Sequence, residues 1–525
     1  MPPLRPSLLQ ASISSLAALL LVPAWAAQAA PAPAFPSLRP LPAAVAGNTL
    51  KLLESRLHRH RDHLERSAQR LTLPEALATG LERNPRLASA FAQIETTRWD
   101  GVAIRREWFP SLIAGNESPG AIGLQQQQGD SSTLISPQLN LAWTFFDPSR
   151  APRRRANAAG LAAERFLFDV EARSLVLDIQ SQYFDLQTLI TLERDYADMS
   201  ALVAYWSQQA RDQARRGPAT PDLDQLASQE QALLILRIDT HEQVIVAASR
   251  LAESLSLPPG EIVMPAQHLT LQGDWSLDRL ATIQQALRLR EEIQQNLAKA
   301  QQLSWTAVAT RRRYLPELAV EASGYVQAEN GNSTISSEAE AGVTLNWTLF
   351  DGGILSASAA AQGQQQQQAL QQAALQRLSV TAQVETSYAA YINSQIVTDS
   401  AIAQLTSARQ SITAASDSYA AGRADATTLL QVLGSYRSAV ESYSRSLQKH
   451  NKAVAELQRY SSQWPESALP LVQRRLQELG RPHIRSSVGI PSSPRPSLSV
   501  SALSRQSARR EERAGPSARS TGTWS

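Results

Sequence analysis

Cysteine is absent from all 525 residues of the chain. An exported protein without cysteine has no disulfide bonds and cannot carry a lipid on an N-terminal cysteine. Aromatic residues make up only 6% of the chain, although hydrophobic residues of all kinds make up 43%. Because large side chains fill the cores of compact domains, this composition favours long helices packed side by side.

A strong charge of either sign is also lacking. The formal net charge is +3, which is too small to indicate a nucleic-acid-binding surface. Much of the excess positive charge lies beyond Pro465, where the chain is rich in Ser, Pro and Arg and has no hydrophobic periodicity. We therefore expect residues 465–525 to form a disordered basic tail.

Long apolar runs are missing after the first 29 residues. Arg5, the apolar stretch 8–22 and the small residues that follow it predict a cleaved signal peptide over residues 1–29. Beyond it no apolar run reaches 18 residues, so the mature chain is predicted to contain no transmembrane helix. A membrane-spanning part would then have to be a β-barrel.

Residues 30–70 form an N-terminal extension that is first Pro-rich and then basic. It contains three histidines, a residue type that can bind metals: His58, His60 and His63. Arginines at positions 56, 59 and 61 surround them and would repel a cation. We predict a solvated, partly helical arm without a metal site.

The chain repeats itself after about 205 residues. The segment LAWTFFD at 141–147 recurs as LNWTLFD at 345–351. Apolar positions further on also correspond: Leu175, Ile179, Tyr183 and Leu186 match Val380, Val384, Tyr388 and Tyr391. A repeat of this length reflects the architecture. We predict two copies over residues 71–256 and 276–464, joined by a linker over residues 257–275.

Each copy is predicted to contain a helix, two strands and two further helices. The first helices are expected over residues 72–107 and 276–313, and Thr72 with Glu75 has the spacing of a capping box. Proline is absent between Arg153 and Gly217. A helix over residues 149–216 would measure about 100 Å, long enough to cross an aqueous compartment.

Residues in the predicted strands alternate between apolar and polar. One face carries Leu139, Leu141, Trp143 and Phe145 in the first copy, and Val343, Leu345, Trp347 and Leu349 in the second. This pattern is typical of a strand between lipid and water, and equally of a half-buried strand in a soluble sheet. The connections at 117–133 and 327–337 are rich in Gly, Gln, Asn and Ser, and are expected to be exposed loops.

Four strands cannot close a barrel, since the smallest barrels have about eight. An open sheet edge is not tolerated in a membrane, so several chains would have to associate. Two, three or four copies would give about 8, 12 or 16 strands, and the composition does not choose among these numbers.

The junctions between strands and long helices carry a family resemblance. The segment WTLFDGG at 347–353, with LPEAL at 73–77, Asn84-Pro85 and FPSL at 109–112, resembles the TolC-like outer-membrane efflux proteins. Asp147 and Asp351 can accept hydrogen bonds from the free N–H groups of a helix start. Gly352 and Gly353 permit a sharp change of direction, and the first copy has Pro148-Ser149 in their place.

The resemblance implies a mainly α-helical trimer in the outer membrane. Three chains would form a 12-stranded β-barrel that continues as a periplasmic tunnel of long helices. Such a protein is a passive exit duct that works with a periplasmic adaptor and an inner-membrane pump, without enzymatic activity or a cofactor. The cargo, small molecules or a secreted protein, remains open. In agreement, the sequence has no phosphate-binding loop and no recognisable nucleophile and base.

Function is expected to concentrate at the two helix-helix turns, over residues 215–224 and 419–427. Gly217 and Gly422 are predicted helix C-caps. The predicted periplasmic entrance and adaptor-docking surface consists of Gly217, Asp222, Asp224, Gly422, Arg423, Asp425 and Gln431. The three aspartates could select cations or simply cap helices. Gln431 stands where relatives commonly have a carboxylate. This difference weakens the inference that the present chain has the same gate.

An alternative from another class is a periplasmic coiled-coil tether or assembly scaffold without transport activity. The long helices would serve that role, and the amphipathic hairpins would then be soluble. His241 and His450 lie on predicted helices and are expected at exposed positions.

Overall fold

The computed structural model describes residues 43–116, 137–215, 222–328 and 335–466, together with 468, 470 and 474. The predicted signal peptide, Gly217, the greater part of both predicted loops and the tail beyond Arg474 lie outside these residues. None of the helices in the described ranges combines the length and hydropathy needed to span a membrane.

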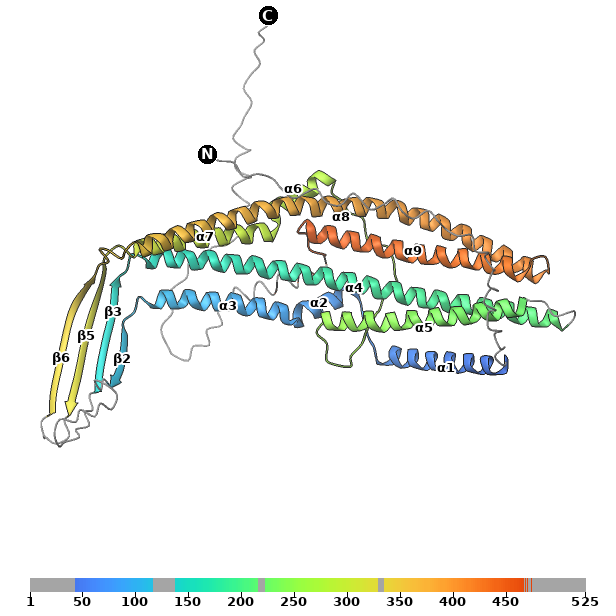
Figure 1. The fold of residues 1–525 in the computed structure, drawn as a ribbon, viewed down its shortest axis with the longest axis horizontal. Coiled ribbons are helices and arrows are strands. Elements are labelled where there is room, and N and C mark those ends of the chain that lie inside the picture. Colours follow the sequence, from blue (N-terminus) through green and yellow to red (C-terminus); the bar gives the residue numbers. More distant parts are fainter. Residues whose placement is uncertain are drawn as a thin grey trace, which may run out of the picture. The chain divides into compact units, whose positions relative to one another are not determined.

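The two copies contain the same elements in the same order (Figure 1). The first has α2 (Leu73–Arg83), α3 (Pro85–Arg106), β2 (Ser111–Asn116), β3 (Pro137–Phe146), α4 (Arg150–Ala214) and α5 (Asp222–Ser254). The second has α6 (Arg279–Leu289), α7 (Glu291–Arg312), β5 (Glu317–Ala328), β6 (Ile335–Asn346), α8 (Ile354–Ala420) and α9 (Ala426–Tyr460). Helices α4 and α8 have 65 and 67 residues, so each measures about 100 Å.

The prediction of one continuous opening helix in each copy was wrong. Asn84 leaves the helical conformation with ψ 125° and separates α2 from α3, because the ring of Pro85 disfavours the helical conformation of the preceding residue. Arg290 breaks the second copy in the same way, with ψ 120° and no proline. The capping box at the start of α2 is confirmed, since Thr72 N donates to Glu75 Oε2 over 2.8 Å.

The contacts group the chain into two units, and each unit takes segments from both copies. In the described part of the chain, unit 1 takes its residues from 43–85, 173–300 and 364–463. Unit 2 takes its residues from 86–172, 301–363 and 464–474. Long-range packing therefore joins the two copies within each unit.

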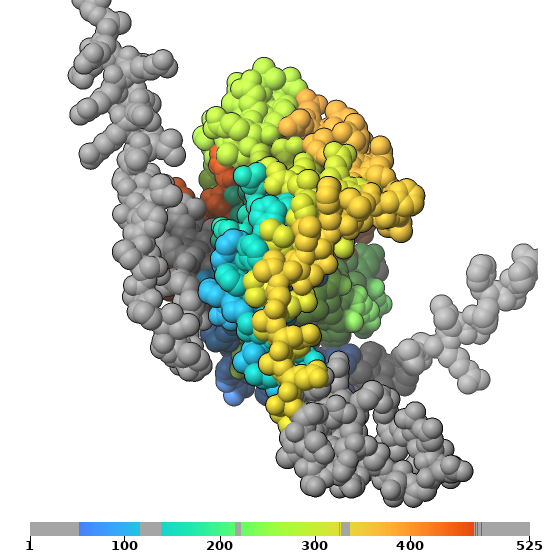
Figure 2. Space-filling model, turned by 90° about the vertical axis from the view of Figure 1, so that its left-hand side faces the viewer, coloured from blue at the N-terminus to red at the C-terminus, as the bar shows by residue number. Residues whose placement is uncertain are grey.

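Unit 2 contains an antiparallel four-stranded sheet in the order β2-β3-β5-β6. The predicted hairpins are thus confirmed, and β3 pairs with β5 to join them. Side chains on the apolar face are solvent-exposed in the single chain: Val343 is 70% exposed and Leu345 is 58% exposed. The yellow atoms of the second hairpin and the following junction lie at the front in Figure 2. Within the described residues, β2 and β6 each have one unpaired edge.

Unit 1 packs helices from both copies around buried apolar side chains. Helix α2 lies close to α4 at Gly80. A Cβ atom added at this glycine would lie only 2.3 Å from Ile179 Cδ1. The predicted inter-repeat linker contributes β4 (Val263–Pro265), which pairs in parallel with β1 (Gln69–Leu71). Tyr183 donates a hydrogen bond from its hydroxyl to Leu71 O over 3.0 Å and fixes this small sheet to α4. The N-terminal extension contributes α1 (Ala43–Ser67).

Candidate functional site: the strand-helix junctions and the helix-helix turns

Aspartates begin both long helices at the strand-helix junctions of unit 2. Asp147 Oδ1 accepts a hydrogen bond of 2.7 Å from Ser149 N. In the second copy, Asp351 accepts hydrogen bonds from Gly353 N at 2.9 Å and Leu355 N at 2.8 Å. The bond from Leu355 is the main cause of the lowered pKa of Asp351, which keeps this carboxylate charged. The structure therefore places both aspartates as helix caps.

Glycines turn the chain before the second long helix. Gly352 and Gly353 have φ values of 69° and 87°, in the left-handed region that other residues rarely adopt. The first copy turns without them, using Pro148 and the buried Arg150. Arg150 Nη2 donates to Glu107 O and Thr144 O, at 3.1 and 3.0 Å. The two junctions thus reach the same change of direction by different means.

One tryptophan in each copy ties the end of the hairpin to the segment that follows the preceding helix. Trp143 Nε1 donates to Trp108 O over 2.9 Å, and Trp347 Nε1 donates to Tyr314 O over 3.0 Å. Sequence reasoning assigned both tryptophans only to an apolar face. Their occurrence at matching places in the two copies was the signal that could have indicated a second, structural role.

The second helix-helix turn, in unit 1, ends α8 with a left-handed glycine. Gly422 has φ 67°. Its N–H donates to Tyr419 O over 3.0 Å, while Arg423 N donates to Ser418 O over 2.8 Å. These two bonds form a Schellman motif, so the predicted C-cap is present in the structure. Arg423 is exposed just beyond it.

Asp425 caps the following helix α9. Its Oδ1 accepts a hydrogen bond from Thr428 N over 3.1 Å. Hydrogen bonds from Thr428 lower the pKa of Asp425, so the exposed carboxylate stays charged. Gln431 lies one turn further along α9 and is exposed. Asp425 is therefore both a helix cap and an exposed negative charge.

Two carboxylates lie in the first helical turn of α5, where the predicted first helix-helix turn ends. Asp222 is half-buried and Asp224 is exposed, and negative charge at a helix N-terminus is favourable. Thr427 Oγ1 donates to Gln225 Oε1 over 3.2 Å, which joins the start of α9 to the start of α5. The structure therefore brings Asp222, Asp224 and Asp425 to the same end of unit 1.

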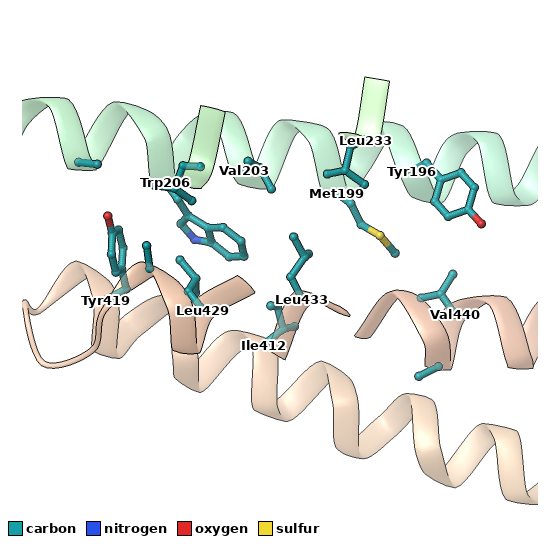
Figure 3. Packing of buried hydrophobic residues seen from close by; sticks show 14 of the residues in the cluster. Tyr196, Met199, Val203, Trp206, Leu233, Ile412, Tyr419, Leu429, Leu433 and Val440 are labelled. Carbon is teal, nitrogen blue, oxygen red and sulfur yellow. The ribbon is translucent and has the colours of Figure 1, made fainter. Parts of the chain in front are cut away.

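Beneath the turns, all four long helices of unit 1 contribute to one hydrophobic cluster (Figure 3). Trp206 of α4 is fully buried at 0% exposure and donates from Nε1 to Ser416 Oγ over 2.9 Å. Tyr419 is also buried, and burial followed by the negative charge of Asp222 raises its pKa. The cluster thus packs the four helices together next to the described turn residues.

The prediction that His241 and His450 are exposed was wrong. Their exposed fractions are 6% and 2%. His450 Nδ1 lies 3.2 Å from Ser394 Oγ, and His241 Nδ1 lies 3.0 Å from Glu193 Oε1. Packing by segments distant in the sequence covers both rings. No group of three or more metal-binding side chains occurs in the part of the chain that the structure describes.

Comparison with known proteins identifies the architecture. Residues 282–462 match the family model described as outer membrane efflux protein. The CmeC outer membrane channel of Campylobacter jejuni has a TM-score of 0.63 at 14% identity, over 78% of this chain and 89% of that chain. The MtrE outer membrane channel of Neisseria gonorrhoeae has a TM-score of 0.60 at 16% identity, over 74% and 89%. No curated protein matches the sequence.

A third solved structure, the outer membrane protein VceC of Vibrio cholerae, has a TM-score of 0.60 at 14% identity, over 74% of this chain and 96% of that chain. The fold is thus that of the outer-membrane channels, mainly helical with four strands in the described sheet. The match over residues 282–462 agrees with these structures, and confirms the TolC-like resemblance predicted from the junction motifs.

Proposed function

We propose that this chain is the outer-membrane exit duct of a tripartite export system, a passive conduit without catalytic activity. One observation carries the proposal: a four-stranded sheet with an exposed apolar face, and with two edges that no other described strand pairs with, continues into helices of 65 and 67 residues. Lipid tolerates no unpaired edge. The sheet becomes complete when the β2 edge of one chain pairs with the β6 edge of another.

Three copies, the number that the TolC-like resemblance implies, would close a barrel of about 12 strands. Helices of unit 1 also expose apolar stripes suited to neighbouring copies. On α8 these are Leu375, Leu378, Ile392 and Ile396, and on α5 they are Ile235, Ile238 and Val246. Exposed apolar surface of this extent supports association of the chains.

The duct is expected to conduct ions when the purified protein is placed in planar bilayers, and to have the mass of a trimer in detergent. Leu345→Arg should reduce insertion strongly, because arginine on a lipid-facing strand costs about 2–4 kcal/mol per chain. Thr344→Arg, on the opposite face of the same strand, is the matched control and should still insert. A monomer that stays soluble without detergent and leaves bilayers silent would contradict the proposal.

We further propose that the two turns form the periplasmic entrance, with Asp222, Asp224 and Asp425 as charged groups facing the solute. Replacing all three with asparagine keeps the capping oxygens but removes the charges. We expect the ratio of cation to anion permeability to fall by about twofold or more, measured from reversal potentials in a salt gradient. Glu385→Gln, an exposed substitution on α8, serves as the charge control. An unchanged ratio in the triple variant would limit the aspartates to capping.

The turns, including Gly217, Gly422, Arg423 and Gln431, are also proposed to dock a periplasmic adaptor that links the duct to an inner-membrane pump. The exposed position of Arg423 and Gln431 next to the hydrophobic cluster supports this role. Adaptor that still co-purifies after both turns are replaced would contradict it. The family match favours efflux over type I protein secretion as the cargo class.

The alternative is a periplasmic tether or scaffold, which would use the same long helices. Heat-modifiable migration and recovery in the outer-membrane fraction would favour the duct. Recovery in the soluble periplasmic fraction would favour the scaffold.

A further inference from the structure

Helix α1 covers a polar cluster on helices α4 and α5 of unit 1. Leu57 and Leu64, two turns apart on α1, are buried, so one face of α1 is packed against the protein (Figure 1). Below this helix lie three buried polar side chains, Glu193 of α4 and Arg237 and His241 of α5. Buried groups of this kind need partners, because an unpaired charge away from water is costly.

A chain of hydrogen bonds runs from α1 through this cluster. His60 Nδ1 lies 3.0 Å from His241 Nε2, and the two rings meet edge to face at an interplanar angle of 83°. His241 Nδ1 in turn lies 3.0 Å from Glu193 Oε1. The carboxylate can only accept, so His241 Nδ1 must carry a hydrogen. The remaining contact between the two imidazoles then needs one hydrogen, on either His60 Nδ1 or His241 Nε2.

This geometry limits the number of protons that the pair can hold. With one proton between the two nitrogens, the bond is intact whether His241 is neutral or charged. When both rings are fully protonated, every ring nitrogen is a donor. Two N–H groups and two positive charges would then face each other over 3.0 Å, and this contact cannot persist.

Other charges around the pair come from each element packed against it. From α1 these are Glu54, Arg61 and Glu65; from α4, Arg194; from α5, Arg237; from β1, Arg70; and after β4, His268. Two of these residues form an ion pair between α1 and α5, since Arg237 Nη1 lies 4.0 Å from Glu54 Oε1. Arg61 is paired with Glu65 on its own helix. Glu65 and Glu54 offset the charges of Arg61 and Arg237, and Glu193 can compensate one positive imidazole. A second positive imidazole has no carboxylate of this kind at hydrogen-bond distance among the described residues, and it meets the first imidazolium over 3.0 Å.

We propose that α1 responds to pH: it is docked on α4 and α5 at neutral pH, and it detaches when His60 and His241 are both protonated. Imidazole changes charge between about pH 5 and 8, so the change falls in the range that an exported protein meets. The undocked state binds more protons than the docked state, and docking therefore weakens as the pH falls. Release would uncover Glu193, Arg237 and His241. This inference does not depend on the proposed transport function.

The test measures the position of α1 in the full-length protein in detergent. Because the chain has no cysteine, Ser55→Cys and Ser249→Cys, both at exposed positions, allow spin labels to be placed on α1 and α5. Distances between the labels are recorded by pulsed electron paramagnetic resonance at about pH 7.5 and pH 5.5. We expect one narrow distribution at the higher pH. At the lower pH, the broad undocked population should rise about tenfold.

Two variants decide whether the imidazole pair causes the change. His60→Asn keeps a hydrogen-bond donor next to His241 Nε2 but cannot be protonated, so α1 should stay docked at both pH values. His58→Asn combined with His63→Asn removes two exposed histidines of the same helix and should leave the pH response intact. The proposal holds only for this combination of results. A wild-type distribution that is independent of pH, or a His60→Asn variant that responds like wild type or is released at both pH values, would overturn it.

Discussion

Replacing Glu292 with glutamine is expected to lower the free energy of unfolding by about 3–5 kcal/mol, because it leaves buried arginine charge without its partner. Glu292 lies in the first turn of α7. Its carboxylate accepts hydrogen bonds from Arg290 Nε at 2.8 Å and Arg459 Nη2 at 2.7 Å. Both arginines are buried. One carboxylate therefore joins the break between α6 and α7 to the end of α9.

The same group predicts how stability depends on pH. Burial by itself raises the pKa of Glu292, but the hydrogen bond from Arg290 and the charges of Arg459 and Arg290 outweigh burial and lower the pKa to about 2. The carboxylate thus contributes stability that is fully present above its ordinary pKa of 4.5. This contribution, about 3 kcal/mol, is lost as the pH falls from 4.5 towards 2.

An exposed ion pair provides the control. Glu385 on α8 accepts from Arg279 over 2.7 Å, a geometry similar to that of Glu292, but both side chains are about half exposed. Glu385→Gln should cost less than about 1 kcal/mol. Urea unfolding followed by far-UV circular dichroism at neutral pH would measure both variants. Equal losses would show that the buried network has no special role.

Trp206→Ala is expected to destabilise the end of the helical unit by about 3–5 kcal/mol. The indole lies within the cluster beneath the turns, in the part that also contains Tyr419 of α8 and Leu429 of α9 (Figure 3). Its removal leaves a cavity and takes away the donor to Ser416 Oγ. Because the turns are attached to this cluster, protease cleavage at the turns should become faster along with the loss of stability.

Tyr205 is the matched control for Trp206, since it is the preceding residue of the same helix but is 55% exposed. Tyr205→Ala should change the free energy of unfolding by no more than about 0.5 kcal/mol. Trp206→Phe should retain most of the packing and lose mainly the hydrogen bond, so an intermediate cost is expected. A Trp206→Ala variant as stable as Tyr205→Ala would show that the cluster tolerates the cavity.

Much of the fold could be predicted because local patterns occur twice. Alternation in 139–145 and 343–349, proline-free stretches and the capping box at Thr72 identified strands and helices without knowledge of their partners. The helix break at Asn84 was missed even though Pro85 signals it. Arg290 has no such signal. Its side chain makes a local contact with Glu292 and tertiary contacts with Tyr460 and Gln383.

The site was less predictable, since its surroundings come from distant parts of the chain. His241 looked like an exposed helical residue because nothing near it in sequence covers it. The structure covers it with α1, whose His60 lies 181 positions away. Gly422 and Asp425, in contrast, act through bonds to neighbouring residues, and their capping roles could be derived from the sequence.

The near-equal lengths of the two copies have a consequence for any trimer. Helices α5 and α9 have 33 and 35 residues, so three chains would present six similar helical hairpins around one axis. The hairpins are not equivalent, because one turn contains Pro218 and Pro221 and the other Gly422 and Arg423. Six partner molecules around the axis would therefore bind two alternating kinds of hairpin. Three partner molecules could all bind the same kind.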